Sequence, residues 1–321
     1  MSEIEVDCDA SADTLCDRAL EVVAKRGWLS KHSWSVSKAV HAFTKPIRVV
    51  LAAETPADVV QQLLLRSPIV AVRLEGSVDA PDPLPGGLHE LILSESFCGS
   101  LATLPDTLHS FEASFVENSN SAAQQSVLQL IPGSLQRLRV NHSCLRYWER
   151  DCMVAALPAL PNLTVLCLQG VEWSTSLPPC LQELCLSGCT VSDELQLPAT
   201  LQKLELAFCR GSSSSSSDAN FAAHLTAILQ HVVIRSDCSV DIGSQLPSTL
   251  THLVLDDRSS ASPGVLPSGL QHLELNRKLS EPVGVLPSTL EVLRLGWRYT
   301  QPLGVEVTRP VPGHLRHPAK D

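Results

Sequence analysis

Histidines recur at nearly constant intervals in the second half of the chain, at His231, His252 and His272. Each directly precedes a short alternation of apolar residues, which predicts a β-strand with the histidine on its outward side. On neighbouring strands about 4.8 Å apart, three imidazoles and the nearby Asp256 could bind Zn²⁺ or Cu²⁺. Ligands in one flat row do not converge tetrahedrally, so the pattern favours an exposed polar face produced by duplication, and we expect no metal or other cofactor.

Cysteines form a second candidate group. Cys167 and Cys185 are predicted to be neighbours on the same outward side, either as a redox or metal-binding pair or, as we favour, as two small residues on a binding face. Cys189 and Cys209 each follow a predicted strand by three residues, where a thiol fills a turn, so we expect a structural role for both. The chain has 11 cysteines, an odd number, which favours thiols over disulfides.

Motifs for catalysis are missing from the sequence. It contains no Gly-x-Ser-x-Gly nucleophile motif, no glycine-rich phosphate-binding loop and no Cys-x-x-Cys pair. We therefore expect that the protein is not an enzyme.

Composition narrows the class of partner. The net charge of −10 opposes binding to nucleic-acid phosphates or to anionic membranes, and 4% aromatic residues are too few for a base-stacking platform. No segment is long and apolar enough to cross a bilayer, and the amino-terminal MSEIEVDCDA does not resemble a secretory signal. We expect a cytoplasmic protein whose partner is another protein.

The elements that would position these residues come from an internal repeat. A phrase of the form Leu-Pro-x-x-Leu-x-x-Leu-x-Leu predicts a turn followed by a strand whose leucines point inward. Stacked copies would bury these leucines in one continuous core and form a parallel sheet. The phrase, or a close variant, begins at Leu84, Leu104, Ile131, Leu177, Leu197, Leu246, Leu266 and Leu286, and a shorter version begins at Pro161.

The last apolar residue of each copy marks its unit. Weaker copies end at Leu51 and Leu74, and a copy concealed in a long gap ends at Ile234, which gives about twelve units. The fold class is therefore an α/β leucine-rich-repeat solenoid, with a long parallel sheet on the concave face and helices or extended loops on the convex face. The remaining markers are Leu93, Ala113, Val140, Leu168, Leu186, Leu206, Leu255, Leu275 and Leu295.

Three regions follow from this repeat. We expect a helical cap over residues 1–45, a solenoid over 46–307 and a tail over 308–321. Longer units have room for helices, which we expect after Thr55, after Ser121, after Asp218 and, less clearly, over 147–156. The 20-residue units leave room only for extended chain.

The last units resemble the FNIP subclass of leucine-rich repeats, whose unit is similar to LPxSLxxLxLGxxFNQPL. Residues 286–303 read LPSTLEVLRLGWRYTQPL and match at Gly296, Gln301, Pro302 and Leu303, with Tyr299 in place of Phe. The resemblance is specific over 246–303 and looser over 84–206. It implies protein–protein interaction without intrinsic catalysis.

These observations predict a scaffold or recognition module that holds another protein on the concave face of the sheet. An alternative is an adaptor in which residues 1–45 recruit an enzyme such as a ubiquitin ligase. The outward residues that we expect to contact the partner are Arg137, Arg139, Glu205, His252, His272, Glu274 and Arg294.

Overall fold

The main strands of the computed structural model occur in two compact units, described separately below. One comprises residues 1–140 with 157–160, and the other comprises 141–156 with 161–321. The predicted cap over 1–45, the tail over 308–321 and the helix after Thr55 lie outside the described residues. The structure describes residues 47–51, 69–76, 84–99, 101–116, 126–143, 153–155, 158–173, 176–191, 196–211, 219–220, 228–235, 240–241, 246–256, 265–275, 283 and 285–296.

In the first unit, successive strands of the sheet lie next to one another in chain order. The pairings β1–β2, β2–β3 and β3–β4 are parallel, so the chain returns to the same edge after each strand. Strand β5 continues past residue 140 into the second unit. These strands are β1 (Ile47–Leu51), β2 (Ile69–Leu74), β3 (Glu90–Leu93), β4 (Ser110–Val116) and β5 (Arg137–Ser143).

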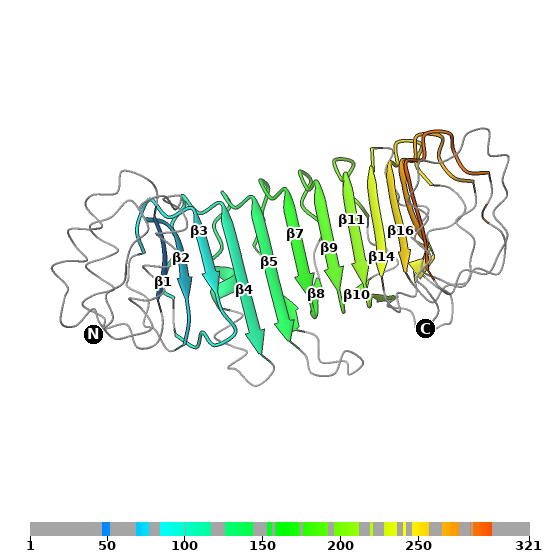
Figure 1. Ribbon diagram of the computed structural model, residues 1–321. Helices are drawn as coiled ribbons and strands as arrows, with labels where there is room; N and C mark the ends of the chain where they lie inside the picture. Colours follow the sequence, from blue (N-terminus) through cyan, green and yellow to red (C-terminus); the bar gives the residue numbers. More distant parts are fainter. Residues whose placement is uncertain are drawn as a thin grey trace, which may run out of the picture. The chain divides into compact units, whose positions relative to one another are not determined.

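The second unit repeats the same arrangement. Its main strands lie side by side in chain order with their arrowheads in the same direction, as β7, β9 and β11 show in Figure 1. All neighbouring pairs in this run are parallel. The strands are β7 (Val165–Gln169), β9 (Glu183–Ser187), β11 (Lys203–Ala207), β14 (His231–Arg235), β16 (His252–Asp256), β17 (His272–Leu275) and β18 (Val292–Leu295).

Strand register confirms the predicted repeat. The marker Leu51 pairs with Leu74, Leu74 pairs with Leu93, and Leu93 pairs with Ala113. In the second unit, each marker from residue 168 to residue 295 pairs with the next in the same way. One side of each of these strands is therefore apolar and buried, because alternate residues point to opposite faces of a strand. Leu204, for example, is 1% exposed.

Turns enter the strands as the Leu-Pro phrase predicts. In the eight full-length phrases the backbone N–H of the first inward leucine after the turn donates to the carbonyl of the proline three residues earlier, as from Leu201 to Pro198 at 3.0 Å. The residue before that leucine joins one unit to the preceding one. The Thr200 hydroxyl lies 2.9 Å from the Pro179 carbonyl and 2.8 Å from the Leu181 carbonyl, where it donates its proton. Thr107 and Thr289 repeat this contact.

After the strand, three successive units turn through the left-handed backbone region. Gly170 and Gly188 have φ of 62°, and Phe208 occupies the equivalent position with φ of 53°. A Cβ atom at Gly170 would lie 2.5 Å from the backbone oxygen of His142, so any other residue here would force the backbone to shift. Phe208 adopts a conformation that L-residues rarely enter because Cβ approaches the following carbonyl.

Short strand pairs follow the main strands, and they correct two predicted helices. The prediction of a helix over 147–156 is wrong for residues 153–155, which form the strand β6 (Met153–Ala155). This strand pairs in parallel with β8 (Val171–Trp173). The prediction of a helix after Asp218 is wrong for residues 219–220, which form the strand β13 (Ala219–Asn220). This strand pairs with β15 (Val240–Asp241). Pairing with the equivalent segment of another unit outweighs local helix propensity at both places.

Other parts of the sequence prediction agree with the described residues. The helix expected after Ser121 is present at 126–129. The short unit after Leu186 carries extended chain at β10 (Thr190–Val191), which pairs in parallel with β12 (Arg210–Gly211) of the longer unit that follows. Within the described part of the chain, no helix has the length and apolar character needed to span a membrane.

Candidate functional site

The outward side of the main strands is the candidate site. Positions that alternate with the buried leucines are partly exposed on every strand from β7 to β17, in the burial pattern expected of a sheet with one solvated face. Parallel register places equivalent outward residues next to one another, so their side chains form rows that run across the strands.

Three histidines form one such row. His231 pairs in register with His252, and His252 pairs with His272. The ring centroids of the first pair are 4.2 Å apart and those of the second pair 5.5 Å apart, with interplanar angles of 22° and 15°. The rings therefore lie face to face as a continuous stack, and we call these three residues the histidine stack.

Electrostatics favour the neutral form at both ends of the histidine stack. Burial, followed by repulsion from a protonated His252, lowers the pKa of His231 and of His272 below the usual 6.5. Lys203 acts in the same direction on His231, and Arg294 acts in the same direction on His272. The carboxylates of Glu183 and Glu274 oppose these effects.

A hydroxyl group orients the central ring. Thr251 Oγ1 lies 2.9 Å from Nδ1 of His252 and 3.2 Å from the backbone carbonyl of Gln230. The hydroxyl therefore bridges the imidazole of His252 and the Gln230 carbonyl, and this contact fixes the position of the ring.

Two valines extend the histidine stack into an apolar patch. Val233 on β14 pairs in register with Val254 on β16, and both are partly exposed beside the imidazoles. With the two outer imidazoles neutral, the stacked rings and the two isopropyl groups present little charge to solvent. We call these five residues the histidine–valine patch: His231, His252, His272, Val233 and Val254.

Charge pairs border this patch. Glu274 Oε2 lies 3.5 Å from a guanidinium nitrogen of Arg294 and 3.9 Å from Nε2 of His272. On the other side, Glu205 Oε1 lies 3.6 Å from Nε of Arg235. Both arginine side chains are more than half exposed, so these pairs add little stability, but they fix the positions of charge around the patch.

One further ion pair continues this border. Lys203 Nζ lies 3.8 Å from Glu183 Oε2, one strand beyond the histidine stack. Both side chains are partly exposed, so this pair also acts by placing charge and contributes little to stability.

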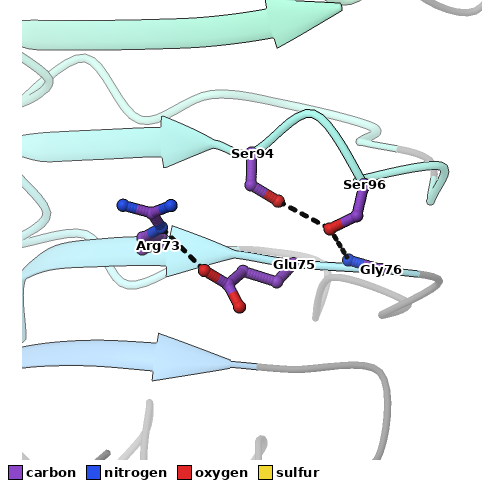
Figure 2. A network of polar contacts seen from close by, with 5 residues as sticks. All are labelled: Arg73, Glu75, Gly76, Ser94 and Ser96. Atoms are coloured by element: carbon purple, nitrogen blue, oxygen red, sulfur yellow. Dashed lines mark hydrogen bonds and ion pairs between the residues drawn. The ribbon is translucent and has the colours of Figure 1, made fainter. Parts of the chain in front are cut away.

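Outward residues of the first unit form a separate charged group. Arg137 and Arg139 are both exposed on β5, and a guanidinium nitrogen of Arg139 lies 3.9 Å from Glu112 Oε2. On β2, Arg73 Nε lies 2.8 Å from Glu75 Oε1 (Figure 2). This part of the face is therefore strongly charged, unlike the histidine–valine patch.

A serine pair holds the turn next to this group. Ser96 Oγ accepts a hydrogen bond from the backbone N–H of Gly76 at 3.0 Å and lies 2.9 Å from Ser94 Oγ. Both contacts are drawn in Figure 2. The contact joins β2 to the turn after β3. It positions the end of the Arg73 strand rather than adding reactive chemistry.

Cysteines divide into two environments, as the sequence predicts. Cys189 and Cys209 are 4% and 0% exposed, and their thiols donate to strand carbonyls, including Leu168 at 3.6 Å and Leu186 at 3.4 Å. Their structural role is confirmed. Cys167 and Cys185 are half-buried register partners on β7 and β9, and a hydrogen bond joins their side chains.

The seven predicted contact residues divide between the two units. Arg137 and Arg139 belong to the first unit, and the other five belong to the second. His272, Glu274 and Arg294 contact one another directly, and Glu205 and His252 lie on other strands of the same run. Within the described residues, no group of three or more His, Cys, Asp or Glu is arranged to hold a metal ion.

Sequence reasoning missed several features of this face. It did not single out the valines, Lys203 or Arg235, although their spacing within the repeat places them in the same rows. It also missed a second imidazole pair in the first unit, His89 and His109, whose centroids are 5.0 Å apart. Their 20-residue separation equals one repeat and was the available signal.

Comparisons with known proteins add one structural similarity. No family model matches the chain, and no curated protein is significantly similar to it in sequence. Among solved structures, the chain is similar to YopM from Yersinia enterocolitica WA-314, with 19% identity and a TM-score of 0.42. The match covers 78% of this chain and 55% of that chain, so this chain spans little more than half of its length. The fold assignment above rests on the register and burial of this chain's own strands.

Proposed function

We propose that the protein is a non-catalytic interaction module and that the histidine–valine patch is the centre of its binding face. The observation that carries this proposal is the combination of a weakly charged, partly desolvated centre with a border of fixed charges. Protein interfaces concentrate binding energy in such centres, where the surrounding polar contacts exclude water.

The chemistry of the patch defines the partner. An apolar or aromatic side chain of a protein segment would cover the imidazoles and the two valines. A basic residue on one side of it would approach Glu205 or Glu274, and an acidic residue would approach Arg235 or Arg294. Mixed charge signs around an apolar centre favour one orientation of the partner over others.

The rigidity of the strands also supports the proposal that the partner binds to this face. Each outward side chain projects from a strand whose neighbours are hydrogen-bonded in register, so little conformational freedom is lost on binding. We propose as contact residues those predicted from the sequence, of which the two arginines at 137 and 139 belong to the first unit: Arg137, Arg139, Glu205, His252, His272, Glu274 and Arg294.

Two further assignments belong to this proposal. We propose that the repeats over 246–303 belong to the FNIP-like subclass, on the basis of the residues matched in 286–303. We also propose a reducing compartment such as the cytoplasm, because Cys98 and Cys180 are exposed thiols.

A paired binding and unfolding assay tests the proposal. The partner is first isolated by affinity purification on the wild-type protein, and binding is then measured for Val254→Asp, which places a charge in the patch. The matched control is Val265→Asp, because Val265 is 83% exposed and lies outside the main strands. We expect at least about a tenfold loss of affinity for the first variant and none for the control.

A second pair of variants tests whether Arg137 and Arg139 contribute to binding. Reversal of charge at Arg137 together with Arg139 should weaken binding without lowering the free energy of unfolding. Deletion of 212–217, a serine run outside the described residues, should leave binding intact. Retention of binding by Val254→Asp, with loss on deletion of the serine run, would show that the sheet face is not the recognition element.

A further inference from the structure

Cys167 and Cys185 differ in position from the other cysteines that the structure describes. They are register partners on β7 and β9, so their side chains leave the sheet on the same face. Neighbouring strands lie about 4.8 Å apart, within the Cα separation of about 4.4–6.8 Å that a disulfide spans.

Access distinguishes this pair as well. Both residues are half-buried on the outward face, where a small solute reaches them. Cys189 and Cys209, by contrast, are buried and donate to backbone carbonyls. We propose that Cys167 and Cys185 are a dithiol site that low-molecular-weight disulfides of the glutathione type oxidise to a reversible cross-strand disulfide.

The reaction is two thiol–disulfide exchanges. The Cys167 thiolate attacks one sulfur of glutathione disulfide, and the S–S bond breaks to release one glutathione thiolate. Cys185 then loses its proton and attacks the Cys167 sulfur of this mixed disulfide, which releases the second glutathione. The protein thiols lose two electrons and two protons in total, and one glutathione disulfide becomes two glutathione thiols.

Electrostatics oppose ionisation of Cys185 while Cys167 is a free thiol. The hydrogen bond with Cys167, followed by burial and the negative charges of Cys167 and Glu205, raises the pKa of the Cys185 thiol, and Lys203 acts in the opposite direction. Once the Cys167 sulfur is in a mixed disulfide it no longer ionises. Its charge is removed, the pKa of Cys185 falls, and Cys185 becomes the resolving nucleophile.

Peptide mapping of the full chain tests the proposal. The protein is incubated with a series of glutathione disulfide concentrations, alkylated, and digested without reduction by a protease that cleaves after glutamate. Residues 150–172 carry Cys152 and Cys167, and residues 184–194 carry Cys185 and Cys189. We expect a joined peptide in which fragment ions link Cys167 to Cys185 and which reduction separates.

The concentration dependence is part of the expected result. The second exchange is intramolecular, so the joined peptide should reach half its maximum at a glutathione disulfide concentration at least about tenfold below that needed to half-modify exposed Cys180. Cys167→Ser and Cys185→Ser should each abolish the link and leave a glutathione adduct on the remaining thiol. Cys152→Ser and Cys189→Ser are the matched controls and should retain it.

Two outcomes would overturn the proposal. One is the formation of stable glutathione adducts at Cys167 and Cys185 with no joined peptide in the wild-type protein. The other is a link that forms to the same extent in urea-unfolded protein, since proximity in the folded sheet would then play no part. Both are read from the wild-type chain, so the test does not depend on the folding of any variant.

Discussion

Acid should destabilise the protein through the histidine stack. Because the folded-state pKa of His231 and of His272 is lowered, the unfolded chain binds protons first as the pH falls below about 6.5. The free energy of unfolding therefore decreases as the pH falls from about 6.5 through the folded-state pKa values of His231 and His272. Below those values the two histidines cause no further decrease. Above about 7 the stack has no effect of this kind, since both states are neutral.

Geometry gives the size of one part of this loss. Two protonated imidazoles at 4.2 Å repel by about 1 kcal/mol in a medium as polar as water, and a pair at 5.5 Å repels by about 0.75 kcal/mol. The nearby carboxylates of Glu183 and Glu274 offset part of this repulsion, although each also has a lysine or arginine beside it. Full protonation therefore costs roughly 1–2 kcal/mol, and burial of the rings adds to this cost.

Urea unfolding at about pH 8 and about pH 5 measures the effect. The double variant His231→Gln with His272→Gln should lose about 1–2 kcal/mol less stability between the two pH values than the wild type does. His252→Gln removes the mutual repulsion but leaves both outer rings partly desolvated, so it should recover a smaller part. Equal losses for the wild type and the double variant would refute this account of the stack.

Four substitutions test the scaffold that carries the face, each by denaturant unfolding. Leu204→Ala should cost about 2–5 kcal/mol, because the side chain is 1% exposed; a loss below about 0.5 kcal/mol would mean that the inward face is misassigned. Thr200→Val should cost about 0.5–1.5 kcal/mol, since the hydroxyl bridge to the preceding unit is lost, and an unchanged midpoint would contradict the bridging role. Gly170→Ala should cost at least about 1–2 kcal/mol, because φ is positive and Cβ meets a backbone oxygen. Phe208→Gly should cost nothing or stabilise by up to about 1 kcal/mol, because relief of strain outweighs the added chain entropy; a clear loss would show that the Phe208 ring packs usefully.

Strand positions could be predicted because they depend on a property that repeats. A leucine every second residue has one low-energy placement, with its side chain inside, and a one-residue slip would expose all of them. The markers from Leu168 to Leu295 therefore pair in the predicted register. The same argument predicts that His231, His252 and His272 lie in one row, as their register confirms.

Segments between the strands could not be predicted in the same way. Residues 153–155 have an apolar character compatible with a helix or a strand, and no local signal distinguishes the two. Their partner, 171–173, lies directly after the strand of the following unit, so the pairing that decides the outcome is non-local. The ring distances in the histidine stack also depend on side-chain rotamers, which repeat spacing does not determine.

A repeat constrains the two faces of its strands in opposite ways. Inside, each unit must offer the same leucines, since a neighbour on either side packs against them, and variation there costs stability. Outside, the register fixes where a side chain stands but not what it is. A row such as Glu183, Lys203, His231, His252 and His272 can therefore change from charged to aromatic within a few strands without altering the fold. That freedom lets the histidine–valine patch, the charge pairs and the Cys167–Cys185 pair lie on one run of strands, each exchangeable without loss of the others.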